Sequence, residues 1–184
     1  AERLQPGDLR RYAERVSQAG ANMNQMINEL LREDARQNVS VSALLEYVLS
    51  QISAFEWRHL VTVSADRNVL EKQIRINLIR LSRALVNLLD NANLAVREVE
   101  AKEIKLSATI DGVDLLLSVA DNGPGFSENY SPDSRGLSAW GSTGIGLAFV
   151  EEVAKNHGGS LVVANRPAGG AVVTFLLPVC EKDE

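Results

Sequence analysis

Near the start of the chain, hydrophobic and polar positions follow a heptad pattern. Apolar or small residues recur in alternating steps of three and four, at Leu9, Tyr12, Val16, Ala19, Met23, Met26 and Leu30. This spacing predicts a helix with one apolar stripe. The stripe is widened by Ala13, Gly20, Ile27 and Leu31, which favours a bundle or a dimer contact over an amphipathic helix lying on its own domain. We therefore predict a bundle helix within residues 1–34.

A polar run from Arg32 to Ser40 ends this pattern, and we predict a linker at residues 35–40. Helical spacing resumes at Val41, Leu44, Leu45, Val48, Leu49 and Ile52. Either Ser40 or Ser42 can cap this second helix, because a serine hydroxyl accepts a hydrogen bond from an N–H group of the first turn. The main domain is therefore predicted at residues 41–184.

The rest of the chain alternates between strand and helix patterns. Strands are predicted at 60–64, 73–76, 104–110, 115–120, 161–163 and 172–177. Helices are predicted from Asn77, as a cap, to about Glu98 and again at 146–156. Asp111-Gly112 and the segment 167–170 predict hairpin turns, whereas 126–140 lacks any period and predicts a loop. Helices interleaved with hairpins predict an α/β fold with a mixed sheet covered on one face.

Composition and charge exclude several classes of function. The chain has 184 residues, a hydrophobic fraction of 45% and a net charge of -5, as expected of a globular domain with a substantial core. The negative charge argues against a nucleic-acid partner, and no apolar run is long enough to span a membrane. Cys180 is the only cysteine, and the chain begins at Ala1 without methionine. We therefore expect a cytoplasmic fragment of a larger protein.

Three motifs follow one another in a fixed order. In the first motif, Asn87 and Asn91 lie four residues apart on a predicted helix, so their amides stack on one face, where an amide oxygen can hold a hydrated cation. In the second motif, Asp121 ends an apolar strand and is followed by Gly123 and Gly125. Its carboxylate can accept a hydrogen bond from an exocyclic amino group.

The third motif, Gly144 to Leu147, opens a helix whose N–H groups can bind phosphate. Each motif has an ordinary alternative: a buried amide satisfied by backbone, an Asx turn, or a flexible loop before a helix. The chain has no G-x-x-x-x-G-K-[ST] sequence, which excludes a P-loop. The combination, in this order, predicts a nucleotide site.

The three motifs resemble the N, G1 and G2 boxes of the GHKL ATPase superfamily, and specifically the ATP-binding domain of sensor histidine kinases. The segments that carry the resemblance are ALVNLLDNA, VADNGPGF and GIGLAFVEEVAKNHGGSL, within residues 41–179. The resemblance implies a Bergerat-type two-layer α/β sandwich, preceded here by the N-terminal bundle helix. It also implies ATP and Mg²⁺ as ligands.

Nine residues are implied to bind the nucleotide, namely Asn87, Asn91, Asp121, Gly123, Gly125, Gly144, Ile145, Gly146 and Leu147. By this resemblance Asn91 coordinates Mg²⁺, with Asn87 assisting from one turn earlier. Asp121 recognises adenine in a pocket shaped by Gly123 and Gly125, and Gly144 and Gly146 bind phosphate. Thr174, on the last predicted strand, is a further candidate to reach the base.

Asn87 favours a histidine over water or serine as the predicted phosphoryl acceptor. Superfamily members that hydrolyse ATP or phosphorylate serine resemble one another in carrying a glutamate here, whereas an imidazole acceptor needs no such base. The chain also departs from the family pattern. Leu94 stands where many members have a lysine that reaches the phosphates, with Arg97 and Arg135 as candidates to replace it. Ala171 stands where a threonine is common.

The first helix resembles the second helix of a dimerisation and histidine-phosphotransfer domain, whose other helix carries the acceptor histidine. His59 lies in a strand-like stretch next to the predicted strand at 60–64, and we expect His157 to be a structural cap at a helix end. Neither has the context of an acceptor, so no catalytic residue is assigned within the chain.

The resemblance therefore implies the catalytic core of a protein-histidine kinase, which transfers the γ-phosphoryl group to a histidine outside the chain and does not autophosphorylate alone. Its implied partners are a response regulator, the missing phosphotransfer helix and a second copy bound through the N-terminal helix. Two alternatives remain open: a degenerate GHKL docking module without turnover, and a hydrolysing GHKL ATPase.

Overall fold

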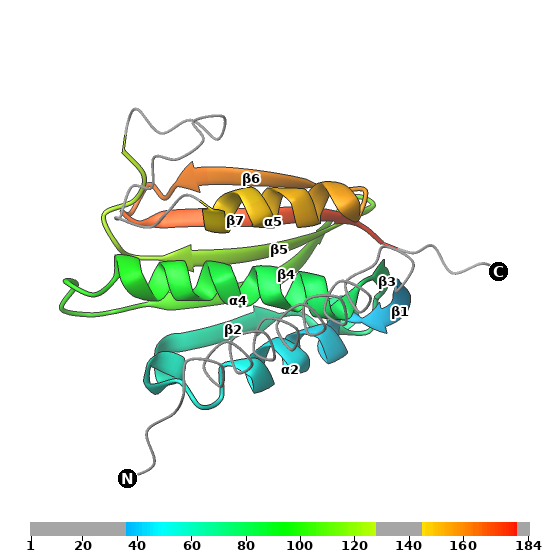
Figure 1. The fold of residues 1–184 in the computed structure, drawn as a ribbon, viewed down its shortest axis with the longest axis horizontal. Helices are drawn as coiled ribbons and strands as arrows, with labels where there is room; N and C mark the ends of the chain where they lie inside the picture. The colour runs from blue at the N-terminus through cyan, green and yellow to red at the C-terminus, as the bar shows by residue number, and fades with distance from the viewer. Residues whose placement is uncertain (1–35, 128–144, 180–184) are drawn as a thin grey trace, which may run out of the picture. The chain divides into compact units, whose positions relative to one another are not determined.

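The computed structural model describes residues 36–127 and 145–179, all within a unit that starts at Arg36 (Figure 1). Several predictions fall outside the described residues: the N-terminal bundle helix, most of the loop at 126–140, Gly144, Arg135 and Cys180. Among the helices that are described, none is both long enough and apolar enough to cross a bilayer.

Five strands form the main sheet in the order β2-β4-β5-β7-β6. Their bounds are Val61–Ala65 for β2, Ile104–Asp111 for β4, Asp114–Asp121 for β5, Ala171–Pro178 for β7 and Ser160–Asn165 for β6. β2 runs parallel to β4, and the other pairs of this sheet are antiparallel. The sheet therefore places the end of β5, at Asp121, beside the start of β7, at Ala171.

Helices α2 (Val41–Gln51), α4 (Leu78–Ala95) and α5 (Ile145–Asn156) cover one face of this sheet (Figure 1). The alternation in β5 explains the arrangement, because Leu115, Leu117 and Val119 are buried while the residues between them are only half-buried. The predicted α/β fold, with a mixed sheet and helices on one face, is confirmed.

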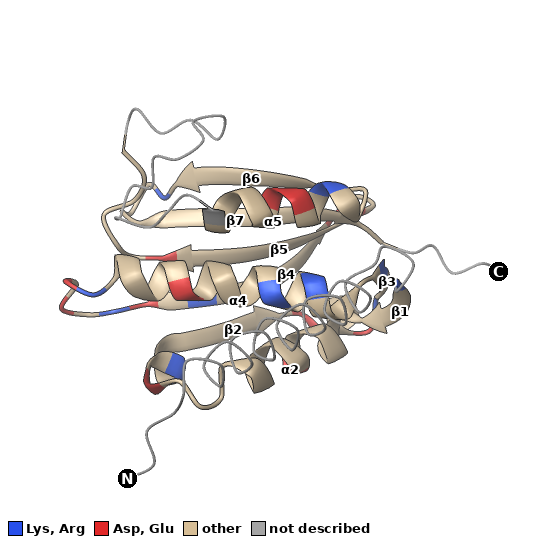
Figure 2. Cartoon of the chain, viewed as in Figure 1, with Lys and Arg blue, Asp and Glu red and all other residues tan. Residues whose placement is uncertain are grey.

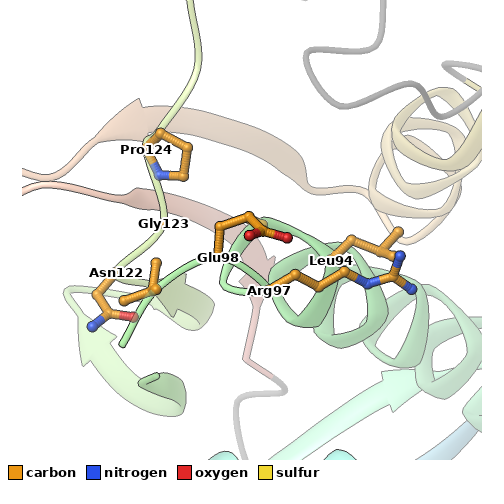
Figure 3. Close-up of a pocket in the computed structure, with 8 residues that line it drawn as sticks. Leu94, Arg97, Glu98, Asn122, Gly123 and Pro124 are labelled. Carbon is orange, nitrogen blue, oxygen red and sulfur yellow. The ribbon is translucent and has the colours of Figure 1, made fainter. Parts of the chain in front are cut away.

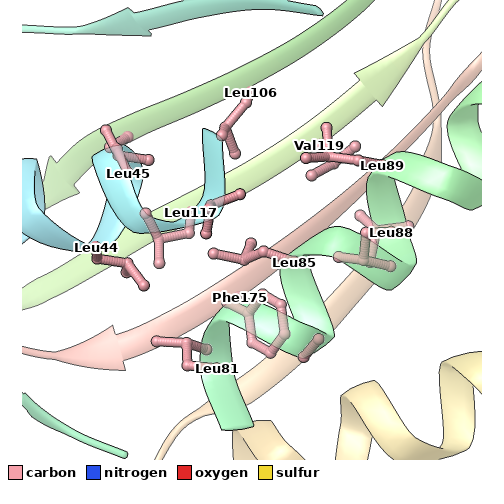
Figure 4. Packing of buried hydrophobic residues seen from close by; sticks show 14 of the residues in the cluster. Leu44, Leu45, Leu81, Leu85, Leu88, Leu89, Leu106, Leu117, Val119 and Phe175 are labelled. Carbon is pink, nitrogen blue, oxygen red and sulfur yellow. The ribbon is translucent and has the colours of Figure 1, made fainter. Parts of the chain in front are cut away.

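The core lies between the helical layer and the sheet, as Figure 4 shows. Its side chains come from α2 (Leu44, Leu45), α4 (Leu81, Leu85, Leu88, Leu89) and the sheet (Leu106, Leu117, Val119, Phe175). None of these is more than 4% exposed. Burial of each such side chain contributes roughly 1.5–3 kcal/mol, so the core holds α4 firmly against the central strands.

Polar contacts at the helix ends fix α4 against α5. Asn77 caps α4 as predicted, its Oδ1 accepting from the N–H of Arg80 at 3.1 Å. The buried His157 donates from Nδ1 to the carbonyl of Val153 at 2.7 Å, and its Nε2 accepts from the N–H of Asn77 at 3.0 Å. Arg80 also pairs with Glu152 at 2.7 Å, and Figure 2 shows basic residues on α4 and acidic residues on α5. The prediction that His157 is a structural cap is confirmed.

Residues 37–40 correct the predicted linker, because they form a strand. Strand β1 (Gln37–Ser40) pairs antiparallel with β3 (Gln73–Ile76), placing Val39 opposite Ile74. Val39 is buried, while Gln37 and Asn38 are exposed. A strand with a single buried apolar residue has too little alternation to be seen in the sequence. Ser40 ends the strand and caps α2, its Oγ accepting from the N–H of Ala43 at 3.2 Å.

Two short helical segments were also not predicted: η2 (Glu56–Leu60), a 3₁₀ helix, and α3 (Arg67–Leu70). His59 therefore lies in η2 rather than in a strand, and its Nδ1 lies 2.6 Å from the carbonyl oxygen of Glu56. Helices of one turn are too short to show a helical period.

Candidate functional site

The two asparagines of the first motif face the start of α5. A Cβ placed on Gly146 would lie 3.4 Å from Nδ2 of Asn87 and 3.7 Å from Nδ2 of Asn91, and both asparagines are half-buried. Because Gly146 has no side chain, the first turn of α5 comes close to the amides. The first N–H groups of a helix have no partner within it and carry its positive dipole end. The structure thus brings the first and third motifs together.

The neighbours of Gly146 differ in what they offer a ligand. Leu147 is half-buried and packs against the core, so a contact from this residue to phosphate is expected from its N–H group. Ile145 begins α5, whereas its side chain lies outside the described residues.

Asp121, at the end of β5, is 6% exposed. Its Oδ1 accepts from the N–H of Gly123 at 2.8 Å and from the N–H of Ala171 at 3.3 Å. The first bond is the Asx turn that the ordinary alternative predicted. Both bonds engage the same oxygen, and among the described residues none donates to Oδ2. One carboxylate oxygen is thus fixed by backbone, and the other remains as an acceptor.

Burial governs the electrostatics of this carboxyl. Burial raises the pKa of Asp121 above its ordinary value of 3.8, because an apolar environment disfavours the charged form. The two backbone N–H groups and the guanidinium of Arg166 act in the opposite direction and lower the pKa, by less than burial raises it. The site therefore holds a buried acceptor whose ionisation depends on its neighbours.

The glycines of the second motif make close backbone approaches. A Cβ on Gly123 would lie 2.9 Å from the carbonyl oxygen of Ala95, so only glycine lets this loop pack against the end of α4. Gly125 has a φ of +79°, and a Cβ there would lie 2.7 Å from Oδ1 of Asn165. The two predicted glycines shape the loop that carries Asp121.

A model of the family of histidine kinase-, DNA gyrase B- and HSP90-like ATPases matches residues 76–181. This range contains all three motifs and the strands that position them. The chain belongs to this ATPase family. The predicted superfamily is thereby confirmed, and the residues described above lie within the matched range.

Curated relatives within this ATPase family are sensor kinases. The chain is 29% identical to the sensor histidine kinase SpaK of Bacillus subtilis, over 96% of this chain and 41% of that protein. It is 30% identical to the sensor histidine kinase ZraS of Escherichia coli K12, over 91% of this chain and 40% of that protein. The chain thus spans less than half the length of these relatives.

Solved structures agree on the fold. The ATP-binding domain of PrrB from Mycobacterium tuberculosis is 25% identical, with a TM-score of 0.60 over 80% of this chain and 99% of that one. The mycobacterial sensor histidine kinase MprB is 24% identical, with a TM-score of 0.63 over 78% of this chain and 97% of that one. The predicted Bergerat-type sandwich of this ATPase is confirmed.

Two residues that were not predicted, Asn165 and Arg166, hold the Asp121 loop of the ATPase domain. The amide of Asn165, at the end of β6, accepts from the N–H of Phe126 at 2.7 Å and donates to its carbonyl at 2.9 Å. Arg166 donates from Nη1 to the main-chain carbonyl of Asp121 at 2.6 Å. The turn composition of this segment was visible in the sequence, but its partners were not.

An open pocket of about 540 Å³ adjoins the Asp121 loop. Figure 3 shows it between Leu94, Arg97 and Glu98, from the end of α4 and the residues after it, and Asn122, Gly123 and Pro124. Leu94, which stands in place of the family's common lysine, is half-buried here. Arg97 supplies a cation to the same pocket, whereas the other candidate replacement, Arg135, lies outside the described residues.

Thr174 lies on the other face of the sheet from Asp121, which corrects the suggestion that it reaches the base beside that residue. It pairs across the sheet with Ser118 of β5, and the two hydroxyl oxygens are 2.8 Å apart. Because side chains alternate along a strand, Ser118 and Asp121 point to opposite faces of the sheet. Thr174 therefore lies on the face of the sheet opposite to α2, α4 and α5.

Proposed function

We propose that this chain is the catalytic ATP-binding core of a sensor histidine kinase, which binds Mg-ATP and transfers the γ-phosphoryl group to a histidine outside the chain. The observation that carries the proposal is the meeting of Asn87, Asn91 and Gly146 at the start of α5. In a chain of this ATPase family, that arrangement joins a cation ligand to a phosphate-binding helix end.

Adenine recognition is assigned to Asp121. Its carboxylate accepts a hydrogen bond from the exocyclic amino group, while the N–H groups of Gly123 and Ala171 hold Oδ1 in place. Gly123 lets the loop pack closely against the end of α4, and Gly125 lets it pack closely against Asn165 and Gly170. Because neither residue has a side chain, the base can approach the main chain of the loop.

The phosphates are assigned to the first turn of α5. The N–H groups of Ile145, Gly146 and Leu147 lie in the first turn of α5, at the positive end of the helix dipole, which favours anions. Gly144, which precedes this turn in the sequence, is assigned to the same phosphate site. Residues 36–127 and 145–179 hold no cluster of three His, Cys, Asp or Glu suited to a metal. A metal held by Asn91, with phosphate and water oxygens as its other ligands, fits Mg²⁺, which is seldom bound by protein groups alone. When bound, Mg²⁺ supplies neutralisation of phosphate charge.

The acceptor lies outside this chain. Both ring nitrogens of His157 are engaged in hydrogen bonds within the buried core, and Nδ1 of His59 lies 2.6 Å from the carbonyl oxygen of Glu56. Asn87 offers no carboxylate base, which suits an imidazole acceptor that is already nucleophilic. We assign the acceptor histidine to a phosphotransfer helix outside this chain.

The same proposal names the partners and the location. A response regulator receives the phosphoryl group from the acceptor histidine, and a second copy of the chain binds through the N-terminal helix. The domain is assigned to the cytoplasm.

Calorimetric titration with a non-hydrolysable Mg-ATP analogue tests this function. The parent chain should bind, and Asp121→Asn should lower affinity about tenfold or more, because a hydrogen bond to a charged acceptor is lost. Asn91→Ala should weaken binding in Mg²⁺ but not in EDTA. Asn93→Ala, a matched change elsewhere on α4, should bind like the parent. Absence of binding, or equal affinities in all four chains, would contradict the proposal.

Leu94 favours one alternative, a docking module without turnover, because the common phosphate-binding lysine is replaced by an apolar side chain. Supplying a separate protein that carries the acceptor histidine distinguishes the two. Phosphoryl transfer from labelled ATP to that histidine supports the kinase, whereas nucleotide binding without transfer supports the docking module. Release of inorganic phosphate without any histidine acceptor would instead indicate a hydrolysing ATPase.

A further inference from the structure

The turn between β6 and β7 holds the Asp121 loop at both of its ends. The amide of Asn165 pairs with both backbone groups of Phe126 at 2.7 and 2.9 Å. At the other end, Arg166 donates to the carbonyl of Asp121 at 2.6 Å. Gly170 packs against that same carbonyl, so closely that a Cβ would collide with the oxygen. The turn is thus built around the main chain of Asp121.

Arg166 is the cation at this contact, and its side chain is half-buried. It belongs to a closed turn, since its N–H donates to the carbonyl of Gly170 at 2.9 Å and its own carbonyl accepts from Gly169 at 3.0 Å. A guanidinium held in this way has a fixed position at the carbonyl of Asp121, and its positive charge acts on the carboxyl of the same residue.

Other charged groups near Asp121 do not take this position. Lys105 of β4 pairs with Ala120 and is exposed, and Glu103 precedes the same strand. Arg97 and Glu98, which carry opposite charges, both line the pocket beside Gly123. β7, from Ala171 to Pro178, carries no charged side chain. Among the described residues, Arg166 is the charge that acts on the Asp121 carboxyl, in the direction of ionisation.

We propose that Arg166 is a positioning residue for nucleobase recognition, which keeps the Asp121 carboxylate aligned and ionised by binding its main-chain carbonyl and placing a positive charge beside it. The inference rests on the proposed function, since it concerns the same site. The side chain of Ala171 has no hydroxyl group and cannot hold the Asp121 carboxylate by a hydrogen bond. The inference therefore assigns the positioning of this carboxylate to Arg166, in the turn before β7. Arg166 acts through Asp121 and does not contact the ligand.

Two measurements on Arg166→Met, Arg166→Lys and the charge-matched control Lys105→Met test the proposal. The first is a carbon NMR titration of the Asp121 carboxyl in the chain without nucleotide. The second compares the affinity for Mg-ATP with that for purine riboside triphosphate, which lacks the exocyclic amino group, from pH 5 to pH 8. Thermal unfolding of each variant confirms that the chains compared are folded.

Arg166→Met should move the Asp121 titration midpoint to higher pH and reduce the preference for Mg-ATP about tenfold near that midpoint, the loss expected when an ionised acceptor is removed. Arg166→Lys should restore the midpoint in part, because it keeps the charge but not the planar donor. Lys105→Met should leave both readouts at parent values. A midpoint in Arg166→Met equal to that of the parent overturns the inference, whatever the change in stability.

The two proposals can fail separately. If the parent does not bind Mg-ATP at any pH, the proposed function fails, while a shifted Asp121 midpoint in Arg166→Met still supports the link between the two residues. If the parent binds and prefers Mg-ATP, and Arg166→Met has the same preference at every pH, the proposed function stands and the role of Arg166 is overturned.

Discussion

Asp121 is buried, although its proposed role requires a charged carboxylate. Its folded-state pKa is raised by burial, so between its ordinary value and the raised value the folded chain binds more protons than the unfolded chain. Under that condition the free energy of unfolding falls as the pH rises through this window. At neutral pH the ionised carboxylate therefore lowers stability, a cost that fits its proposed role as an acceptor.

Asp121→Asn should accordingly melt at the same temperature as the parent or higher at pH 7, although it binds nucleotide more weakly. Asparagine keeps an oxygen for the N–H groups of Gly123 and Ala171 but carries no charge. The difference in melting temperature should shrink as the pH falls towards 3.8, the ordinary value for the group. Calorimetric melts across pH measure this. A clearly less stable variant at pH 7 would show that the carboxylate stabilises the fold.

Single residues differ in how far the sequence could reveal them. Asn87, Asn91 and Asp121 stand out because each is a polar residue within or at the end of an apolar pattern. Asn165 and Arg166 do not, because their partners lie 39 and 45 residues earlier in the chain. Only the pairing of β5 with β7 brings them together, and no local pattern encodes that distance.

At the scale of elements, the turn between β6 and β7 offers a matched pair of glycines. Gly169 and Gly170 have nearly equal φ angles of +92° and +93°. A Cβ on Gly169 would have nothing within 4 Å, whereas one on Gly170 would meet the main chain of Asp121 and Asn122. A side chain at either position would be strained by the positive φ angle, but only a side chain at Gly170 would also collide with neighbouring main-chain atoms.

Gly169→Ala should therefore cost about 1–3 kcal/mol, the usual cost of a residue in this region of φ. Gly170→Ala should cost clearly more, since main-chain atoms cannot move aside, and it should also weaken Mg-ATP binding by displacing Asp121. Urea denaturation of both variants measures the difference. Equal midpoints would mean that the close approach of the turn to β5 contributes nothing to stability.

Elements with a clear period were predicted well. The bounds of β3 agree at both ends, and those of α5 and β4 agree within one residue. Periodicity failed where a segment was short or mainly polar, as in β1, α3 and η2. β1 owes its existence to its partner β3 rather than to its own composition, which is a tertiary influence that propensity does not contain.

The molecule as a whole carries a net charge of -5 and yet is assigned an anionic ligand. Binding must therefore rely on local fields rather than on overall attraction. The first turn of α5 supplies one such field.

The sequence predicted the two layers of the fold, but it did not predict the strand order or the parallel pairing of β2 with β4, since these depend on contacts distant along the chain.

Because a ligand that binds only the folded chain stabilises it, Mg-ATP at about 100 times its dissociation constant should add about 2.7 kcal/mol. For a chain of this size the melting temperature should rise by about 5–10 °C. Thermal scans of the parent and Asp121→Asn at the same Mg-ATP concentration measure this, and the variant should show about half of the parent's shift or less. An equal shift with Mg²⁺ and inorganic triphosphate would assign the effect to phosphate alone.

The pairing of β5 with β7 has a consequence for the order of folding. The hairpins β4–β5 and β6–β7 each join neighbouring segments and close quickly, but the bond between Asp121 and Ala171 spans 50 residues. Contacts of such separation form late, because closing a long loop costs more entropy. Oδ1 of Asp121, the proposed base acceptor, is therefore held by both of its backbone donors only after β5 has paired with β7. We expect nucleotide binding to follow this pairing rather than to guide it.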